Sequence, residues 1–231
     1  MKDLLKDKPP ESGEIEFLID RSPVSLQSKG ARKKEFKEYV ATKIKKVNFL
    51  LSGDVRVRIQ WSVHEQKRYE TSTSADVDNI VKPLLDAICG PKGILIDDNQ
   101  VQAIECFWVD SYEYDREQID IRIKYIPDEY LPKKDLAFIC MNKNLCIPFW
   151  KNHRAEELAI FISAHEHMLA CRDEMMDTGK SYYESKGVLS IQRVFHKSRL
   201  QGFDIENIDE LKKRIAYHNL ATSADRKKRG G

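Results

Sequence analysis

The chain has 231 residues, of which 41% are apolar and 33% are charged. This length suits one large domain, or a medium domain with a smaller second part, at about 100–200 residues per domain. Apolar residues recur at regular spacing, and no uncharged stretch approaches the roughly 20 residues that cross a bilayer, which excludes a disordered chain and a transmembrane helix. Charges interrupt the first seven residues, so we expect no signal peptide and a cytoplasmic protein.

The charge is balanced in total but unevenly distributed. The 39 basic and 37 acidic residues give a net charge of +2, which alone indicates no polyanionic partner. Between residues 29 and 46, eight basic residues face two acidic ones, and residues 226–229 form a second basic cluster, whereas acids dominate from 76 to 120. This pattern suits a protein that holds a polyanion and a cation. The alternative, two solvated charged faces, is the one that charge alone favours.

The cysteines indicate a reducing environment. There are five of them, an odd number without close pairing, as expected for free thiols. Histidines between Cys146 and Cys171 raise the question of a zinc site, but the spacings match no common ligand pattern. We therefore interpret these residues as parts of the core and surface.

The first 74 residues predict a strand, a helix, a second strand and a loop. Residues 15–19 alternate between apolar and other side chains, as in a short strand. After Gly30, an apolar stripe predicts an amphipathic helix whose lysines and Arg32 are exposed. The stripe comprises Phe36, Val40, Ile44, Val47 and Leu51. Residues 55–63 alternate without a break and predict a half-buried strand, and the polar residues 64–74 predict a loop.

At Asp76 the apolar period becomes helical. One apolar face runs to Ile88, and Pro83 is expected to kink this helix near its start. The opposite face carries Asp78, Asn79, Lys82 and Asp86. A turn and a short apolar segment follow. Residues 101–109, apolar on both faces, predict an inner strand, and residues 119–125 alternate as another strand.

A boundary is expected at residues 127–135, which hold two prolines and five charged residues. The order of elements before it predicts an α+β domain over residues 1–127. Residues 128–231 predict a mainly helical extension, with helices near 155–176 and 208–218 and a basic tail.

The sharpest chemical feature is Asp-Val-Asp-Asn-Ile-Val-Lys at 76–82, followed by Asp-Asp-Asn-Gln at 97–100. Two carboxylates at a loop-to-helix junction can enter one cavity, and a third from a neighbouring segment completes an oxygen cage of the kind that suits Mg²⁺. Without a cation, clustered carboxylates repel one another. Lys82, one turn after Asp78, is placed to orient a carboxylate or to offset charge on a phosphate oxygen.

Each of these residues also has a structural interpretation. Asp76 or Asp78 could cap the helix, and Asp97 and Asp98 could be turn residues. Lys82 could be an ordinary partner of an acid one turn away. Together these roles explain less well why two acids begin the helix and two more follow a turn, but composition and spacing alone leave both interpretations open.

The same residues carry a family resemblance. Asp-Val-Asp-Asn-Ile-Val-Lys-Pro-Leu-Leu-Asp-Ala-Ile, then Gly, then Leu-Ile-Asp-Asp-Asn-Gln-Val, resembles the RusA family of Holliday junction resolvases. Residues 22–28 are similar, more loosely, to the segment before the first helix of that family. The resemblance covers about residues 12–127, and its combination of acids, lysine and glutamine is specific.

The resemblance implies a small mixed sheet with two packed helices, and a homodimer that binds four-way DNA junctions and cuts symmetric strands with Mg²⁺, for which Mn²⁺ would substitute. The acids that bind the metal and perform catalysis in the family correspond to Asp76, Asp78 and Asp98, and its essential lysine corresponds to Lys82. In such a mechanism the metal activates a bound water and draws charge from the phosphate.

Asn79 and Asp97 fall on neighbouring motif positions and are expected to support the site. Family members are usually basic, whereas residues 1–127 hold 21 basic and 22 acidic residues, a net of −1. Because phosphate neutralisation supplies much of the affinity for DNA, binding would rest on a local basic patch. The expected DNA-binding residues are Arg32, Lys33, Lys34, Lys37, Lys67 and Arg68.

The extension, residues 128–231, is a second departure from the family. It could add DNA contacts through Arg193, Lys197, Arg199 and the basic tail, or dock a partner. It could equally be a helical cap that only stabilises the dimer.

We therefore expect an Mg²⁺-dependent endonuclease that resolves four-way junctions by paired nicks in recombination and repair. Two alternatives stay open: a protein that binds junctions or other branched DNA with weak or no nuclease activity, and a nuclease that acts on other branched DNA.

Overall fold

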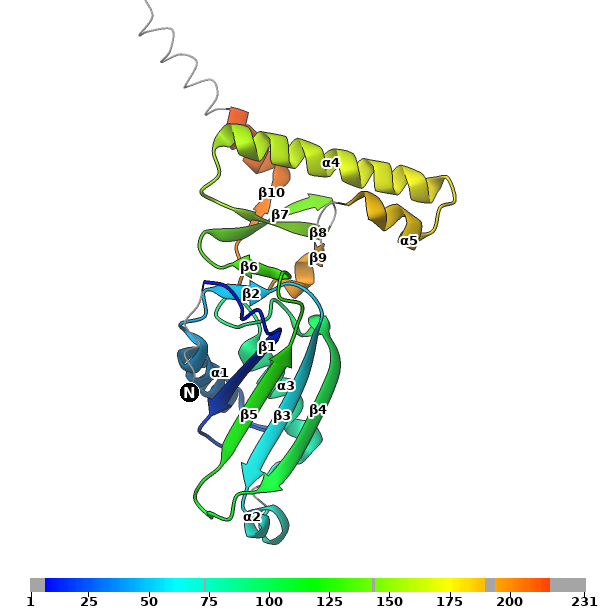
Figure 1. Cartoon of the computed structure of the whole chain (residues 1–231). Helices are drawn as coiled ribbons and strands as arrows, with labels where there is room; N and C mark the ends of the chain where they lie inside the picture. The colour runs from blue at the N-terminus through cyan, green and yellow to red at the C-terminus, as the bar shows by residue number, and fades with distance from the viewer. Residues whose placement is uncertain (1–6, 73, 143, 190–193, 217–231) are drawn as a thin grey trace, which may run out of the picture. The chain divides into compact units, whose positions relative to one another are not determined.

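The computed structural model describes residues 7–72, 74–142, 144–189 and 194–216. The chain divides into two compact units, Met1–Lys133 and Lys134–Gly231 (Figure 1). The boundary expected from the sequence, between residues 127 and 128, lies close to this division. That the two parts act as separate domains stays a prediction.

The first unit is built on a four-stranded sheet in the order β1-β5-β3-β4. Its strands are β1 (Glu14–Ile19), β3 (Val55–Val63), β4 (Val101–Asp110) and β5 (Gln118–Lys124). β5 pairs antiparallel with both β1 and β3, and β3 pairs parallel with β4. Every second residue of β1, β3 and β5 is buried, which confirms the strands expected from alternation in these segments.

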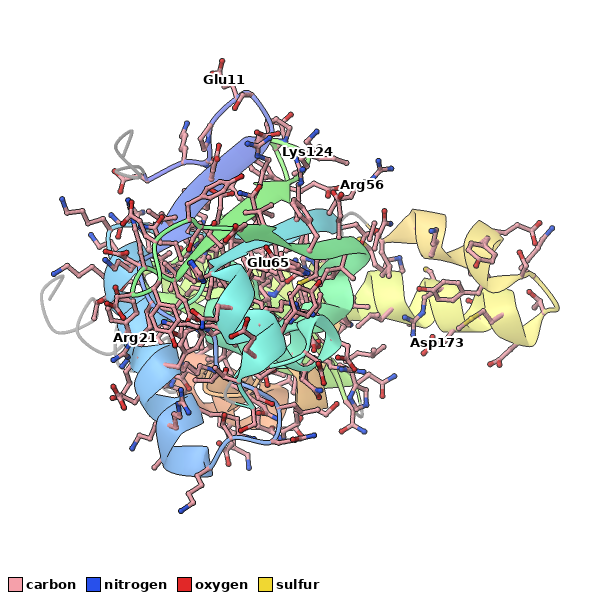
Figure 2. The ribbon with its side chains drawn as sticks, turned by 90° about the horizontal axis from the view of Figure 1, so that it is seen from below. Glu11, Arg21, Arg56, Glu65, Lys124 and Asp173 are labelled. Carbon is pink, nitrogen blue, oxygen red and sulfur yellow. The ribbon has the colours of Figure 1, made fainter. Side chains whose placement is uncertain are left out.

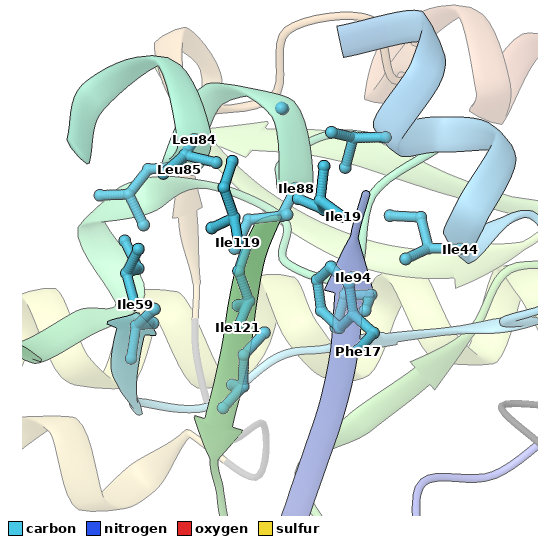
Figure 3. Packing of buried hydrophobic residues seen from close by; sticks show 14 of the residues in the cluster. Phe17, Ile19, Ile44, Ile59, Leu84, Leu85, Ile88, Ile94, Ile119 and Ile121 are labelled. Atoms are coloured by element: carbon cyan, nitrogen blue, oxygen red, sulfur yellow. The ribbon is translucent and has the colours of Figure 1, made fainter. Parts of the chain in front are cut away.

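Two helices cover one face of this sheet, as Figure 1 shows. They are α1 (Gly30–Ile44) and α3 (Val77–Ile88). In α3 the side chains of Leu84, Leu85 and Ile88 point toward the sheet, where Ile119 and Ile121 lie (Figure 3). Each fully buried leucine or isoleucine contributes about 1.5–3 kcal/mol, so α3 is firmly anchored.

The connection between β3 and β4 carries the acidic motif. Parallel neighbours need a crossover connection, since a tight turn cannot join them. The crossover contains α2 (Glu65–Glu70), α3 and the 3₁₀ helix η1 (Asp98–Gln100). One connection therefore holds both acidic segments.

Two expectations for the early part of this unit were wrong. The first helix ends at Ile44, and Leu51 belongs to β2 (Phe49–Leu51), which pairs with β6 (Tyr130–Pro132). All three β2 residues are buried, so their apolar character reflects a strand and not a helical stripe. The stretch 64–74 is not entirely loop, because α2 forms where the His64 side chain accepts a hydrogen bond from the amide of Gln66 at 3.2 Å.

The expectation that residues 101–109 form an inner strand was also wrong. Among the described strands, β4 pairs with β3 alone and lies at an edge of the sheet. Its residues 102–105 are exposed, with Ile104 43% exposed. The apolar side chains on both faces of β4 therefore do not indicate that the strand has a neighbour on each side. The helices α1 and α3 cover only one face of the sheet.

The second unit combines a sheet with a long helix. Residues 136–150 form a hairpin, and the sheet order is β10-β7-β8-β9. The strands are β7 (Leu136–Asn142), β8 (Leu145–Trp150), β9 (Phe195–His196) and β10 (Ile205–Asn207). α4 (Ala155–Asp177) confirms the long helix and packs Leu158, Ile162 and Leu169 against the sheet.

The remaining elements of this unit are short. They are α5 (Tyr182–Ser185) and the 3₁₀ helices η2 (Lys186–Val188) and η3 (Lys197–Arg199). Residues 208–216 are helical, as expected, and the rest of that predicted helix lies outside the described residues. The α+β fold class with a helical C-terminal region is confirmed. None of the described helices has the length and apolar character needed to cross a bilayer.

Candidate active site

The first acidic segment lies where the chain enters α3. Asp76 occupies the position before the first helical residue, and its backbone is extended. Its carboxylate makes no capping hydrogen bond, so Asp76 is not held as a helix cap. Asp78 lies in the first turn, and both side chains are exposed. Neither carboxylate has a hydrogen-bond or ion-pair partner within the described parts of the chain.

Pro83 connects α3 to the segment that precedes α1. A proline has no amide hydrogen, so the carbonyl four residues earlier, that of Asn79, lacks its usual helical partner. The amide of Leu26 donates to this carbonyl at 2.7 Å. Pro83 therefore leaves the carbonyl of Asn79 available to accept a hydrogen bond from outside the helix. The backbone of Asn79 therefore holds the segment of residues 22–28 beside the helix. That Asn79 supports a catalytic site stays a prediction.

Lys82 joins the two acidic segments. Its Nζ lies 2.6 Å from a carboxylate oxygen of Asp98 and 2.6 Å from one of Asp86. Burial is the largest single influence on Lys82 and favours the neutral amine, but the hydrogen bonds to Asp86 and Asp98 outweigh it and raise the pKa of the lysine. Lys82 is therefore a fixed cation. The i,i+4 role considered for it is present with Asp86.

The second acidic segment is held by a dense set of hydrogen bonds. Asp97 caps η1 by accepting from the amide of Asn99 at 3.1 Å, within a capping box completed by Gln100. The buried Gln100 side chain accepts from the amides of Ile96 and Asp97, and donates to two carbonyls near β2. Asp97 thus caps the turn that carries Asp98. That Asp97 supports a catalytic site stays a prediction.

The pKa of the Cys89 thiol reflects the charged groups near the end of α3. Burial, and then the carboxylates of Asp98, Asp97 and Asp86, raise the pKa of this thiol. Lys37 of α1 acts in the opposite direction. Acids from α3 and η1 therefore share one neighbourhood with a basic residue of α1.

The donor set fits a hard divalent cation, but the cage is not preassembled. Asp76, Asp78 and Asp98 offer only carboxylate oxygens, the ligands that Mg²⁺ prefers. Within the residues that the structure describes, no three histidine, cysteine, aspartate or glutamate side chains are grouped closely enough to hold an ion. Asp98 is engaged by Lys82, so binding a metal with all three acids requires side-chain movement.

The predicted DNA-binding residues of α1 lie on an open surface. Arg32, Lys34 and Lys37 are exposed and have no ion-pair partner among the described residues. Lys33 donates to the carbonyl of Leu26 at 3.0 Å, which ties α1 to the same segment that contacts α3. Figure 2 shows Arg21 beside α1, where it pairs with Glu35 at 2.8 Å.

The two predicted DNA-binding residues of α2 are engaged within the protein. Lys67 pairs with Glu117 at 3.3 Å, and both side chains are mostly buried. Arg68 donates to the carbonyl of Ala75 at 3.0 Å, and its guanidinium lies 5.6 Å from the centre of the Trp61 ring. Arg68 therefore fixes the backbone immediately before Asp76.

The basic residues considered in the extension belong to the second unit. Lys197 and Arg199 lie in η3. Arg193 and the basic tail, residues 226–229, lie outside the described residues. Their contribution to DNA binding stays a prediction.

Two further side chains contribute to this arrangement. Asp86 is the second partner of Lys82, as the i,i+4 interpretation of Lys82 allowed. Gln100 holds the turn that carries Asp98 through buried hydrogen bonds to the amides of Ile96 and Asp97. An acid followed three residues later by glutamine is a capping-box signal, so the role of Gln100 was detectable from the Asp97-to-Gln100 spacing.

Comparison with known proteins agrees with this arrangement. Residues 25–124 match the family described as Endodeoxyribonuclease RusA. The matched region runs from the segment before α1 to the end of β5 and contains both acidic segments and Lys82. No curated protein matches the chain significantly. Residues 25–124 are therefore similar to the RusA family of endodeoxyribonucleases.

Proposed function

We propose that this protein is an Mg²⁺-dependent, structure-selective endonuclease that resolves four-way DNA junctions in recombination and repair. The observation that carries the proposal is the contact between Lys82 and Asp98, because it brings the two acidic segments of the motif to one place. The family match supports nuclease chemistry on DNA. Branched DNA as substrate and the need for a divalent ion are the finer parts of the proposal.

In this proposal Asp76, Asp78 and Asp98 hold the metal. When bound there, Mg²⁺ would lower the pKa of a coordinated water and offset charge on the scissile phosphate. Lys82 is already charged and fixed between two acids, so it can stabilise negative charge on a phosphate oxygen. Asp97 and Gln100 orient Asp98. Mn²⁺ is expected to substitute for Mg²⁺.

Paired nicks require two sites, and each chain contains one set of the acids. The active form is therefore proposed to be a homodimer, with its DNA-binding surface on α1. Because the proposed substrate is recombining DNA, the proposed location is the cytoplasm. Sedimentation of the purified protein, free and with a junction, tests the dimer.

The decisive experiment measures cleavage of a synthetic four-way junction in Mg²⁺. Wild-type protein should give symmetric nicks, and Asp76→Asn should give none because a ligand has lost its charge. Asp115→Asn, an exposed acid in the loop before β5, is the matched control and should cut normally. Normal cleavage by Asp76→Asn would remove Asp76 from the site. A flap and a linear duplex tested in parallel show whether junctions are preferred.

A second candidate is a junction-binding protein with weak or no nuclease activity. The observation that favours it is the engagement of Asp98 by Lys82, together with the lack of a preassembled acidic cage in the described chain. Tight junction binding without nicking in either Mg²⁺ or Mn²⁺ would support this candidate over the nuclease.

A further inference from the structure

A pocket of about 210 Å³ lies in the first unit, next to the residues that lead into the acidic motif. It is lined by the segment before α1 with the first turn of α1, by the end of β3 with α2, by the residues before Asp76, and by Glu117 before β5. The lining residues that matter here are Ser25, Ser28, Arg32, Trp61, Lys67 and Ser74. A liquid water occupies about 30 Å³, so the pocket has room for a phosphate-sized group and several waters.

Two serine hydroxyls of this pocket are oriented as donors. The Oγ of Ser28 accepts from the amide of Ser25 at 3.2 Å, and the Oγ of Ser25 accepts from the amide of Gln27 at 3.2 Å. Each hydroxyl also carries one hydrogen to donate. Because the backbone amides already take an acceptor position on both oxygens, these hydrogens are available to an acceptor in the pocket.

Three further polar atoms near the pocket lack a partner among the described residues. They are Nε1 of Trp61, Oγ of Ser74 and Nε of Arg68. The Trp61 side chain is only 1% exposed, and an indole N–H can only donate. An unpaired buried donor costs about 1–3 kcal/mol, so these atoms call for an acceptor that the protein itself does not supply.

The charge of the pocket favours an anion. Arg32 lines it and has no ion-pair partner in the described chain. Lys67 and Glu117, which also lines the pocket, pair at 3.3 Å and offset each other. The lining therefore has a net charge of +1, and its one carboxylate is already neutralised.

We propose that this pocket binds a backbone phosphate of the DNA strand beside the phosphate that is cut, an inference that rests on the proposed function. Ser74 precedes Asp76 by two residues, so their Cα atoms lie within about 7.6 Å. That span is comparable to the separation of neighbouring phosphates on one strand, which is larger than their axial rise of about 3.4 Å because the strand winds around the helix. A phosphate in the pocket would fix the register of the strand and thereby select which bond reaches the acids.

The test pairs neutral phosphates with pocket variants. Junctions that carry one uncharged methylphosphonate, placed in turn at each of the three linkages on either side of the cut, are titrated in Ca²⁺ with fluorescence anisotropy as the readout. Ser74→Ala and Ser28→Ala should each weaken binding of the normal junction about 10-fold, as expected for a lost hydrogen bond to a charged group. Ser62→Ala, on β3 but outside the pocket lining, is the matched control and should bind normally.

The inference is decided by whether the effects of the neutral linkage and of the Ser74→Ala substitution on binding free energy are additive. One neutral linkage should weaken wild-type binding by at least about 10-fold and weaken Ser74→Ala binding by a clearly smaller factor, because both changes remove the Ser74 contact. Losses that add at every linkage, or unaltered binding by both serine variants, would overturn the pocket assignment. Trp61→Phe, which keeps an aromatic ring and removes the N–H, should show the same coupling.

Salt dependence and cleavage separate this inference from the proposed function. Arg32→Gln should reduce the slope of log affinity against log salt by about 0.9, whereas Ser74→Ala should leave the slope unchanged. Normal junction cleavage by wild type together with additive losses refutes the pocket alone. Non-additive binding losses in a protein that does not cleave junctions in Mg²⁺ would support the phosphate-binding assignment of the pocket and refute the proposed nuclease activity.

Discussion

The two acidic segments of the site differ in how firmly the fold holds them. At the start of α3, Asp76 and Asp78 are exposed, and their carboxylates have no partner in the described chain. Beyond the helix, Asp97 and Gln100 fix η1 through reciprocal hydrogen bonds, and Lys82 holds Asp98. One segment is adaptable and the other is preorganised.

This difference suggests a division of labour. A rigid element positions a group precisely only when its own hydrogen bonds are satisfied, as they are around Gln100. Unpartnered carboxylates keep their charge available for a ligand that arrives later. We infer that η1 sets the position of Asp98, and that Asp76 and Asp78 adjust to the metal and the DNA.

The largest expected effect separates the two partners of Lys82. Asp98 and Asp86 both lie 2.6 Å from its Nζ, so replacing either by alanine removes one ion pair. If only Asp98 binds metal, Asp98→Ala should reduce single-turnover junction cleavage by about 1,000-fold, and Asp86→Ala by less than about 10-fold. Equal losses would mean that the charge around Lys82, and not metal ligation, makes Asp98 necessary.

The next effect tests the rigidity of η1. Gln100 is fully buried and makes hydrogen bonds of 2.8 to 3.1 Å with two amides and two carbonyls. Gln100→Ala leaves these groups unpaired and should lower the free energy of unfolding by about 3 kcal/mol, measured by urea denaturation. The exposed Gln102 is the matched control, and Gln102→Ala should change stability by less than about 0.5 kcal/mol. A similar loss for both glutamines would argue against a preorganised η1.

A smaller effect compares the two aspartates that precede helices. Asp97 caps η1, so Asp97→Ala should destabilise the protein by about 1 kcal/mol. Asp76 has the same position before α3 but makes no capping bond, so Asp76→Ala should cost less than about 0.5 kcal/mol in thermal unfolding while cleavage is lost. A cost of 1 kcal/mol at Asp76 would restore its interpretation as a structural cap.

Much of the first unit was predictable because its elements are half-buried. Alternation in residues 55–63 reports directly on a strand with one covered face, and the α3 pattern reports on a helix lying on that face. The same logic failed for β4, since apolar residues on both faces say nothing about which strands neighbour it. Leu51 fits a helical period by coincidence, and only its pairing with β6 reveals the strand.

The sequence identified a set of candidate site residues but not their geometry. Spacing and resemblance pointed to the acids and to Lys82, because these residues are contiguous in sequence motifs. The engagement of Asp98 by Lys82 depends on how η1 folds back toward α3. The unpartnered Trp61 N–H also depends on tertiary packing, since the alternation of β3 marks Trp61 only as a core residue.

The smallest expected effect concerns a third pair of acids, Asp120 and Glu16, on the sheet face that α1 and α3 do not cover. Burial, followed by the hydrogen bond and the charge of Glu16, raises the pKa of Asp120 to about 6. The hydrogen bond from Arg122 lowers the pKa of Glu16. The two carboxylates therefore lie close together with a proton on Asp120 reducing their repulsion. The unfolded chain releases the Asp120 proton near 3.8. Wild-type stability attributable to Asp120 is therefore lost as the pH rises from about 4 to about 6.

Asp120→Asn should remove this loss. The variant and wild type should have the same free energy of unfolding near pH 3.5. Between pH 4 and pH 6 the variant should become the more stable of the two. Above pH 7 its free energy of unfolding should exceed that of wild type by less than about 1 kcal/mol, because solvent screens this partly exposed group. Urea unfolding of both proteins at pH 3.5, 5 and 7.5 measures the difference, in which the titration of all other acids cancels. Adding Glu16→Gln to both proteins should shrink the gain, since the neighbouring charge that favours protonated Asp120 is gone. A gain that is independent of pH would show that Asp120 and Glu16 do not share a proton.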